Sequence, residues 1–148
     1  MSKISTLTFT QTLEHLEGYR GVARVRDIAP VAFDEPRELG GEDSAPCPMD
    51  YLLTAVGGCL MSSLALCLQK KRVDARLTME VSGRVERNEE GLLAVAGIEA
   101  DIRVQAPDDQ WKKVEGCYQV FKKYCIVSAS VARGIPLETR LLRESGDG

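Results

Sequence analysis

The feature that most constrains the fold is a run of 18 consecutive residues without a formal charge, from Tyr51 to Leu68. Pro48 suits the first turn of a helix, and Asp50 places a negative charge near the positive N-terminal end. Three basic residues at 70–72 follow the run, where the C-terminus of a helix favours cations. We therefore predict one long helix over residues 48–72.

An uncharged run of this length is also a candidate for a membrane span. The glycines at 57–58, together with Thr54, Ser62 and Ser63, dilute its hydrophobicity, and the flanking sequence has the pattern of soluble strands. We favour a helix that is apolar on nearly all sides and must be buried on all sides. A chain of 148 residues has little material to wrap such a helix, so we expect a homodimer.

Length and charge exclude several classes of protein. The size of 148 residues fits one domain over residues 1–148. A formal net charge of −3 and a pI near 5.3 give no reason to expect nucleic acid or an anionic membrane as partner. The N-terminal residues carry no apolar signal segment, so we expect a cytoplasmic protein.

The five cysteines, at positions 47, 59, 67, 117 and 125, are an odd set in a chain without a secretory signal. We therefore expect reduced thiols rather than a framework of disulfides. No pair shows C-x-x-C spacing and His15 is the only histidine, so no metal and no other cofactor is expected. Cys67 and Cys117 fit best as small core residues, and Cys47 lies in a loop.

Alternating apolar and polar residues predict strands on both sides of the central helix. In the clearest case Leu77, Met79, Val81 and Val85 form the buried face. Hairpins and helices without regular βαβ alternation indicate an α+β fold. The predicted elements are strands at 4–13, 20–27, 76–86, 98–104 and 135–142, turns at 17–19 and 88–91, an exposed loop at 36–48, a helix from 107–109 to 125, a short helix at 126–134 and a frayed end at 144–148.

Two of the cysteines stand out by their positions. Cys59 follows two glycines that allow a close approach to the long helix, and Cys125 lies where the second helix ends and the chain turns. The residues alone leave open whether this pair is functional or only packs in the core.

Two motifs then carry a family resemblance. Residues 48–59, PMDYLLTAVGGC, and residues 124–128, YCIVS, resemble the OsmC/Ohr family, and more closely its YhfA-like branch. The order of elements fits from about residue 4 to residue 143. The resemblance implies an α+β OsmC-like fold, an intertwined homodimer in which antiparallel β-sheets from both chains wrap two long central helices.

The resemblance also implies a chemistry. In active family members the cysteine matching Cys59 attacks a hydroperoxide as a thiolate, and the one matching Cys125 resolves the sulfenic acid as a disulfide, which a dithiol reductant reopens. A loop arginine that stabilises the thiolate matches Arg20. The family's glutamate falls at Met49, with Asp50 as the nearest carboxylate. The alternatives are a helix-dipole role for Asp50 and a solvated turn position for Arg20.

Three functions remain in competition. The leading hypothesis is a thiol-dependent peroxidase for organic hydroperoxides that uses Cys59 and Cys125, with a role in stress and detoxification. The second is a carrier of the same fold that holds a small apolar or thiol-bearing ligand beside Cys59, which Met49 motivates. The third is an interaction or structural dimer in which both cysteines only pack.

Overall fold

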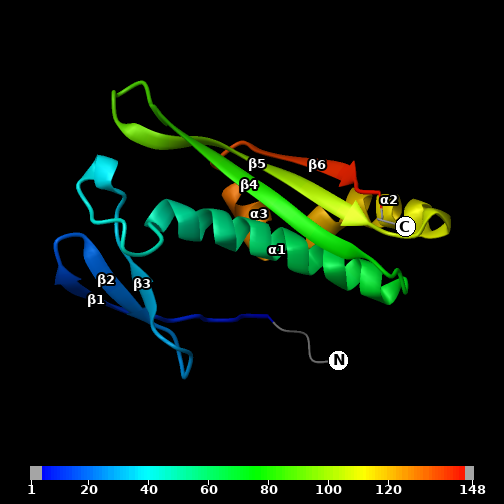
Figure 1. Ribbon diagram of the computed structural model, residues 1–148, viewed down its shortest axis with the longest axis horizontal. Coiled ribbons are helices and arrows are strands. Elements are labelled where there is room, and N and C mark those ends of the chain that lie inside the picture. The colour runs from blue at the N-terminus through cyan, green and yellow to red at the C-terminus, as the bar shows by residue number, and fades with distance from the viewer. Residues whose placement is uncertain (1–4, 146–148) are drawn as a thin grey trace. The chain divides into compact units, whose positions relative to one another are not determined.

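The computed structural model describes residues 5–145, and its internal contacts divide the chain into two compact units. One unit ends at Tyr51 and the other begins at Leu52, and each is described by itself (Figure 1). The single domain expected over residues 1–148 stays a prediction. Of the expected frayed end, residues 146–148 lie outside the described residues.

The first unit contains a three-stranded antiparallel sheet in the order β1 (Thr12–Glu17), β2 (Arg20–Arg24) and β3 (Val31–Phe33). The predicted turn at 17–19 is present, and Gly18 takes the left-handed conformation with φ 58° that glycine tolerates. The strand predicted at 4–13 instead runs over 12–17. Its partner β2 ends opposite Thr12, so residues 5–11 find no ladder in this sheet despite their alternation, and residue 4 of the predicted strand lies outside the described residues.

The loop after β3 is tied to Asp34, whose side chain is only 1% exposed. Asp34 accepts hydrogen bonds from the backbone N–H groups of Glu35, Glu42 and Ser44, and from the Ser44 hydroxyl at 2.7 Å. The Ser44 hydroxyl, followed by the backbone donors, lowers the pKa of Asp34 and outweighs the opposing effect of burial. The predicted loop over 36–48 therefore has an internal anchor and a short 3₁₀ turn, η1 (Arg37–Leu39).

The long helix α1 spans Pro48–Lys70, close to the predicted bounds. The single chain covers one stripe of the helix and leaves Leu66 52% exposed, so burial of the helix on all sides would require a second copy and stays a prediction. The helix is long and apolar enough to cross a membrane, but core helices of soluble proteins have the same length and composition. Its buried stripe identifies it as a core helix, and this stripe consists of Val56, Gly57, Leu60, Leu64 and Leu68.

The second unit contains a mixed sheet in the order β4 (Arg76–Arg87), β5 (Leu93–Gln105) and β6 (Leu137–Arg143). β4 and β5 form the predicted long hairpin, visible in Figure 1, with Gly91 in the left-handed conformation in its turn. β6 pairs in parallel with β5, which the sequence analysis did not foresee. The crossover between them contains η2 (Asp108–Gln110), α2 (Trp111–Val120), η3 (Phe121–Tyr124) and α3 (Ile126–Val131).

The helices pack on one face of this sheet. On β5 the alternate residues Ile98, Ala100, Ile102 and Val104 are buried, and they form one core cluster with the buried stripe of α1 and with residues of α2 and η3. The alternation predicted for β4 holds as far as Val81. Val85 was predicted to be buried but is 48% exposed; it lies toward the hairpin end of β4, just past a register shift in the ladder.

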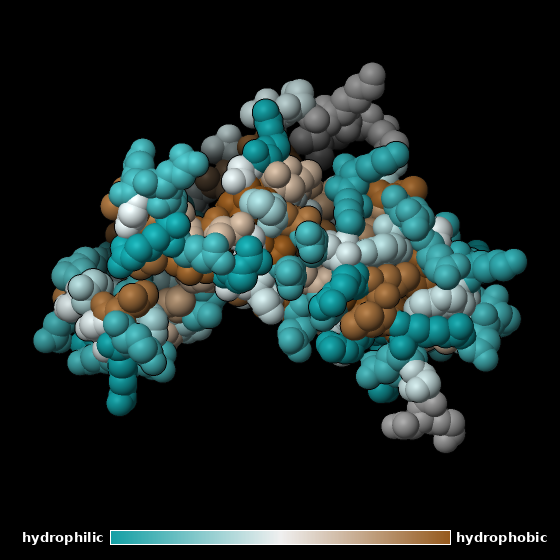
Figure 2. Space-filling view, turned by 90° about the horizontal axis from the view of Figure 1, so that it is seen from above, coloured by the Kyte–Doolittle hydropathy of each residue, from teal (hydrophilic) through white to brown (hydrophobic). Residues whose placement is uncertain are grey.

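Apolar side chains also remain at the surface of the chain. Figure 2 shows brown areas of apolar surface among the hydrophilic ones on the face that it presents. In the second unit the exposed large apolar residues are Leu66, Val85, Leu92, Leu93, Val120, Tyr124 and Ile126.

Candidate active site

The second unit brings Cys59 and Cys125 together. Cys59 lies on α1 between the buried residues Val56 and Leu60, and Cys125 lies where η3 ends and α3 begins. The backbone N–H of Val127 donates to the Cys59 sulfur over 3.4 Å, and the Cys125 thiol lies near enough to influence the pKa of Cys59. The two thiols predicted from the motifs therefore share one site.

The surroundings of Cys59 favour its thiolate. Burial on its own raises the pKa of the Cys59 thiol. Hydrogen bonds from the Cys125 thiol and from three consecutive backbone N–H groups, at 126–128, outweigh this effect and lower the pKa below its ordinary value. A lowered pKa increases the fraction of thiolate at neutral pH, and the thiolate is the nucleophilic form.

Cys125 has the opposite tendency. Its side chain is 1% exposed, and burial raises the pKa of the Cys125 thiol. Its hydrogen bond to Cys59 raises the pKa further, although the hydroxyl of the buried Ser128 acts in the other direction. Cys125 is thus the protonated donor and Cys59 the acceptor, and the two cysteines have different chemical roles although they are neighbours.

Arg20 and Asp50, the other two predicted site residues, lie in the first unit. Arg20 forms ion pairs with Glu17 at 3.0 Å and with Glu42 at 3.8 Å. Asp50 accepts a hydrogen bond of 2.8 Å from the backbone N–H of Cys47, the residue before α1. This is the helix-capping arrangement, in line with the alternative interpretation of Asp50. Catalytic roles for Arg20 and Asp50 stay predictions.

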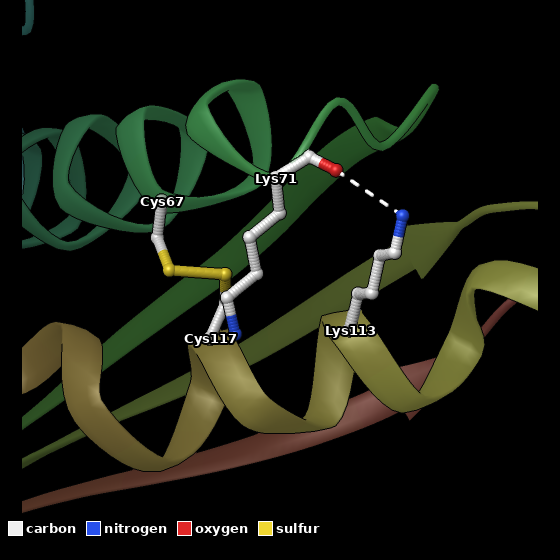
Figure 3. The surroundings of a disulfide bond; sticks show 4 residues. All are labelled: Cys67, Lys71, Lys113 and Cys117. Atoms are coloured by element: carbon white, nitrogen blue, oxygen red, sulfur yellow. Dashed lines mark hydrogen bonds between the residues drawn. A yellow bond between two sulfur atoms is a disulfide. The ribbon is translucent and has the colours of Figure 1, made fainter.

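The remaining cysteines include a disulfide that the sequence analysis missed. Cys67 and Cys117 are bonded, with 5.7 Å between their Cα atoms, so the expectation of reduced thiols is wrong for this pair (Figure 3). The bond joins α1 to α2. The sequence does contain a signal, because Cys59 and Cys67 are eight residues apart, as are Cys117 and Cys125. Cys47 is free and half-buried.

Two further features of the site escaped the sequence analysis. The roles of the N–H groups at 126–128 and of the Ser128 hydroxyl follow from the backbone turn at Cys125, which residue types alone do not indicate. Beside the site lies a hollow of about 100 Å³. Its lining includes Ser128 and is completed by Leu60, Lys122, Ala129, Ala132, Leu137 and Thr139.

The described residues offer no arrangement suited to a metal. Within residues 5–145, no group of three or more His, Cys, Asp or Glu side chains is placed to hold an ion. The chemistry that this arrangement supports is that of a nucleophilic thiolate with a second thiol in contact with it. Such a pair can form a disulfide after one sulfur is oxidised.

Comparison with known proteins gives a family and a fold. Residues 41–140 match the model of the OsmC-like protein family. The sequence has no significant match among curated proteins.

Several solved structures share the fold over nearly the whole chain. An OsmC-like protein of unknown function from Vibrio cholerae has a TM-score of 0.81 at 11% identity, covering 93% of this chain and 100% of that one. An OsmC-like protein from Mycoplasma pneumoniae has a TM-score of 0.77 at 15% identity, covering 93% and 97%. An organic hydroperoxide resistance protein from Legionella pneumophila has a TM-score of 0.66 at 16% identity, covering 94% and 99%.

Proposed function

Because this chain belongs to the OsmC-like protein family, we propose that it is a thiol-dependent peroxidase that reduces organic hydroperoxides through Cys59 and Cys125. The observation that carries the proposal is the unlike setting of two neighbouring thiols: Cys59 is half-buried and accepts a hydrogen bond from the Val127 N–H over 3.4 Å, whereas Cys125 is only 1% exposed. In line with this geometry, the pKa of Cys59 is lowered and that of Cys125 is raised. A packing pair has no need of this asymmetry, whereas a nucleophile with a resolving partner requires it.

The reaction begins at Cys59. Its thiolate attacks one oxygen of the hydroperoxide, so that an S–O bond forms and the O–O bond breaks. The alkoxide that leaves takes a proton and departs as an alcohol. Cys59 is then a sulfenic acid and has lost two electrons to the substrate. The N–H of Val127, which donates to this sulfur over 3.4 Å, holds the thiolate in place for the attack.

Cys125 then completes the oxidative half. Its sulfur attacks the sulfenic sulfur of Cys59, an S–S bond forms, and water leaves with the thiol proton. A cellular dithiol returns both residues to thiols by exchange and is itself oxidised to a disulfide. Since Cys125 is 1% exposed and Cys59 is more open, the reductant attacks the Cys59 sulfur and Cys125 is the leaving group.

The remaining parts of the proposal concern assembly and supporting residues. The exposed side of α1, with Leu66 52% exposed, supports a homodimer in which a second copy covers this helix. Arg20 supports the Cys59 thiolate, and Asp50 sets the start of α1 by capping it. We place the protein in the cytoplasm, as a single OsmC-like domain with a role in stress and detoxification.

The carrier function is the weaker candidate. Ligand pockets commonly measure about 300–1,000 Å³. The hollow lined by Leu60 and Ser128 measures about 100 Å³ and accommodates only a very small group. Met49, at the position of the family's glutamate, is the residue that favours a carrier.

Catalytic turnover tests the proposal. With cumene hydroperoxide and excess dithiothreitol, the wild-type protein is expected to consume many equivalents of peroxide, and Cys59→Ser none above background. Cys47→Ser serves as the matched control, because Cys47 is a free cysteine that belongs to the first unit and has no part in the proposed reaction, and this variant should behave as wild type. Equal consumption by the wild-type protein and Cys59→Ser would refute the peroxidase.

A further inference from the structure

Two cysteine pairs bridge the same two parts of the second unit. Cys59 and Cys67 both lie on α1, Cys117 lies on α2, and Cys125 lies at the end of η3, which directly follows α2. Cys67 is bonded to Cys117, and Cys59 neighbours Cys125 and accepts a hydrogen bond from the N–H of Val127, two residues further on. The spacing of eight residues is the same on both segments. The pairs are therefore successive cross-connections between one helix and the segment that lies along it.

The disulfide lies in a positively charged setting. Lys71, one helical turn after Cys67, extends toward α2 in Figure 3, and a Cβ atom at Gly116 would lie 3.1 Å from its ammonium nitrogen. Lys113 donates from its own ammonium group to the backbone oxygen of Lys71 over 3.4 Å. Positive charge beside a cysteine favours its thiolate, which is the form that enters thiol–disulfide exchange.

The two sulfurs differ in their access to solvent. Cys117 is fully buried, whereas Cys67 is half-buried. An external thiol can therefore reach the bond only from the side of Cys67. In the cytoplasm, where we have proposed that this protein acts, thiols are kept reduced, and a disulfide that forms there is usually a transient, redox-sensing bond.

We propose that Cys67 and Cys117 are a second, reversible redox pair, and that their disulfide clamps α2 against α1 and so keeps Cys125 at Cys59. The proposal adds regulation to the site at Cys59, and in this respect it rests on the proposed function. In the closed state the segment that leads to Cys125 is tied to α1 at Cys117. In the open state that segment is held by packing, chiefly of the buried Val114 and Phe121, and by the hydrogen bonds of Lys113 and Tyr118, without a covalent tie to α1.

The redox step is a balanced exchange with a low-molecular-weight thiol such as glutathione. The glutathione thiolate attacks the Cys67 sulfur, and a mixed disulfide forms while the bond to Cys117 breaks and Cys117 takes a proton. A second glutathione thiolate releases Cys67 as a thiol and leaves as oxidised glutathione. Closure reverses these steps, with oxidised glutathione as the acceptor of two electrons.

The first test measures the pair in the wild-type protein. The protein is equilibrated with buffers of graded ratios of reduced to oxidised glutathione, quenched with N-ethylmaleimide, and analysed by peptide mass spectrometry. We expect the Cys67–Cys117 bond to pass from dithiol to disulfide within this range of ratios. A bond that stays closed at every ratio, or open at every ratio, overturns the reversible pair.

The second test measures the clamp without any peroxide. The rate of Cys59 alkylation by iodoacetamide is recorded against pH in the wild-type disulfide form, in Cys67→Ser/Cys117→Ser, and in Cys47→Ser as control. Loss of the clamp loosens the donors around Cys59, so the double variant should reach half its maximal rate at a pH higher by about half a unit. An unchanged profile in the double variant overturns the clamp.

Peroxide chemistry is then a separate readout. With the clamp open, Cys59–Cys125 disulfide formation by cumene hydroperoxide should slow by about threefold or more. If hydroperoxide oxidises Cys59 in neither state, the proposed function fails, whereas the glutathione and alkylation results still decide the redox pair and the clamp. If the two states oxidise Cys59 at equal rates, the regulation is refuted and the peroxidase stands.

Discussion

Gly57 sets how closely α1 packs against β4, and this contact is the basis of our first prediction. A Cβ atom at Gly57 would lie 2.8 Å from a methyl carbon of Val81 and 3.5 Å from the sulfur of Met79. Nonbonded carbons normally stay about 3.5–4.0 Å apart, so Gly57→Ala forces either the helix or the strand to move. The site of this strain lies two residues before Cys59.

Two opposing effects decide the magnitude. Alanine is better than glycine within a helix by about 0.8–1.0 kcal/mol. Overpacking a filled core costs about 1–3 kcal/mol. The contact of 2.8 Å is with a β-branched side chain on a paired strand, which has little freedom to give way. We therefore expect Gly57→Ala to lower the free energy of unfolding, by up to about 2 kcal/mol.

The assay is urea unfolding followed by circular dichroism, at one protein concentration, for Gly57→Ala, Val81→Ala and the double variant. Val81→Ala removes the methyl group that the new Cβ would strike. In that background Gly57→Ala should cost at least about 1 kcal/mol less than in the wild-type background. A Gly57→Ala protein as stable as wild type, or an equal cost in both backgrounds, would refute the reasoning.

Three further predictions follow from other contacts. Because hydrogen bonds lower the pKa of Cys59, its iodoacetamide alkylation should reach half its maximal rate at a pH below that of an ordinary cysteine; a profile at or above the ordinary one contradicts the described site. The ionised Asp34 carboxylate stabilises the fold above its unfolded pKa, and this stabilisation is lost as the pH falls through its lower folded pKa. Asp34→Asn should therefore speed amide hydrogen exchange at Ser44 at neutral pH and remove the loss of stability that Asp34 causes in acid. Unchanged amide exchange at Ser44 would argue against the anchor. The Cys67–Cys117 bond spans a sequence separation of 50. In the chain-entropy model, Cys67→Ser/Cys117→Ser should therefore lower the free energy of unfolding by about 4 kcal/mol. A loss below about 1 kcal/mol in urea unfolding would count against the bond.

Local sequence patterns were sufficient to predict the main helix and the main hairpin. The start of α1 follows from Pro48 and its end from the basic residues at 70–72, because these signals act on the helix termini themselves. The β4–β5 hairpin follows from the alternation of apolar and polar residues. The Cys59–Cys125 contact could be predicted only through the family motifs, since pairs distant in sequence leave no local periodicity.

Features that depend on tertiary contacts could not be predicted. The parallel pairing of β6 requires knowing that α2 and α3 cross over the sheet. Val85 is exposed although it continues the alternation of β4, because burial also depends on what packs against that end of the sheet, which alternation alone does not reveal. The Cys67–Cys117 bond contradicts the prediction of reduced thiols, which was based on the odd number of cysteines and on the expected cytoplasmic location. Neither observation indicates which cysteines lie opposite each other on neighbouring helices.

The measurement that tests the central claim most directly is the fate of the two site cysteines after a single oxidation. The protein, with Cys59 and Cys125 reduced, receives one equivalent of cumene hydroperoxide, and peptide mass spectrometry assigns every thiol and disulfide, with Cys125→Ser treated in parallel. We predict a Cys59–Cys125 disulfide within seconds in the wild-type protein and sulfenic acid on Cys59 in the variant. Cys59 and Cys125 both remaining reduced, while the peroxide is left unconsumed, would contradict the account.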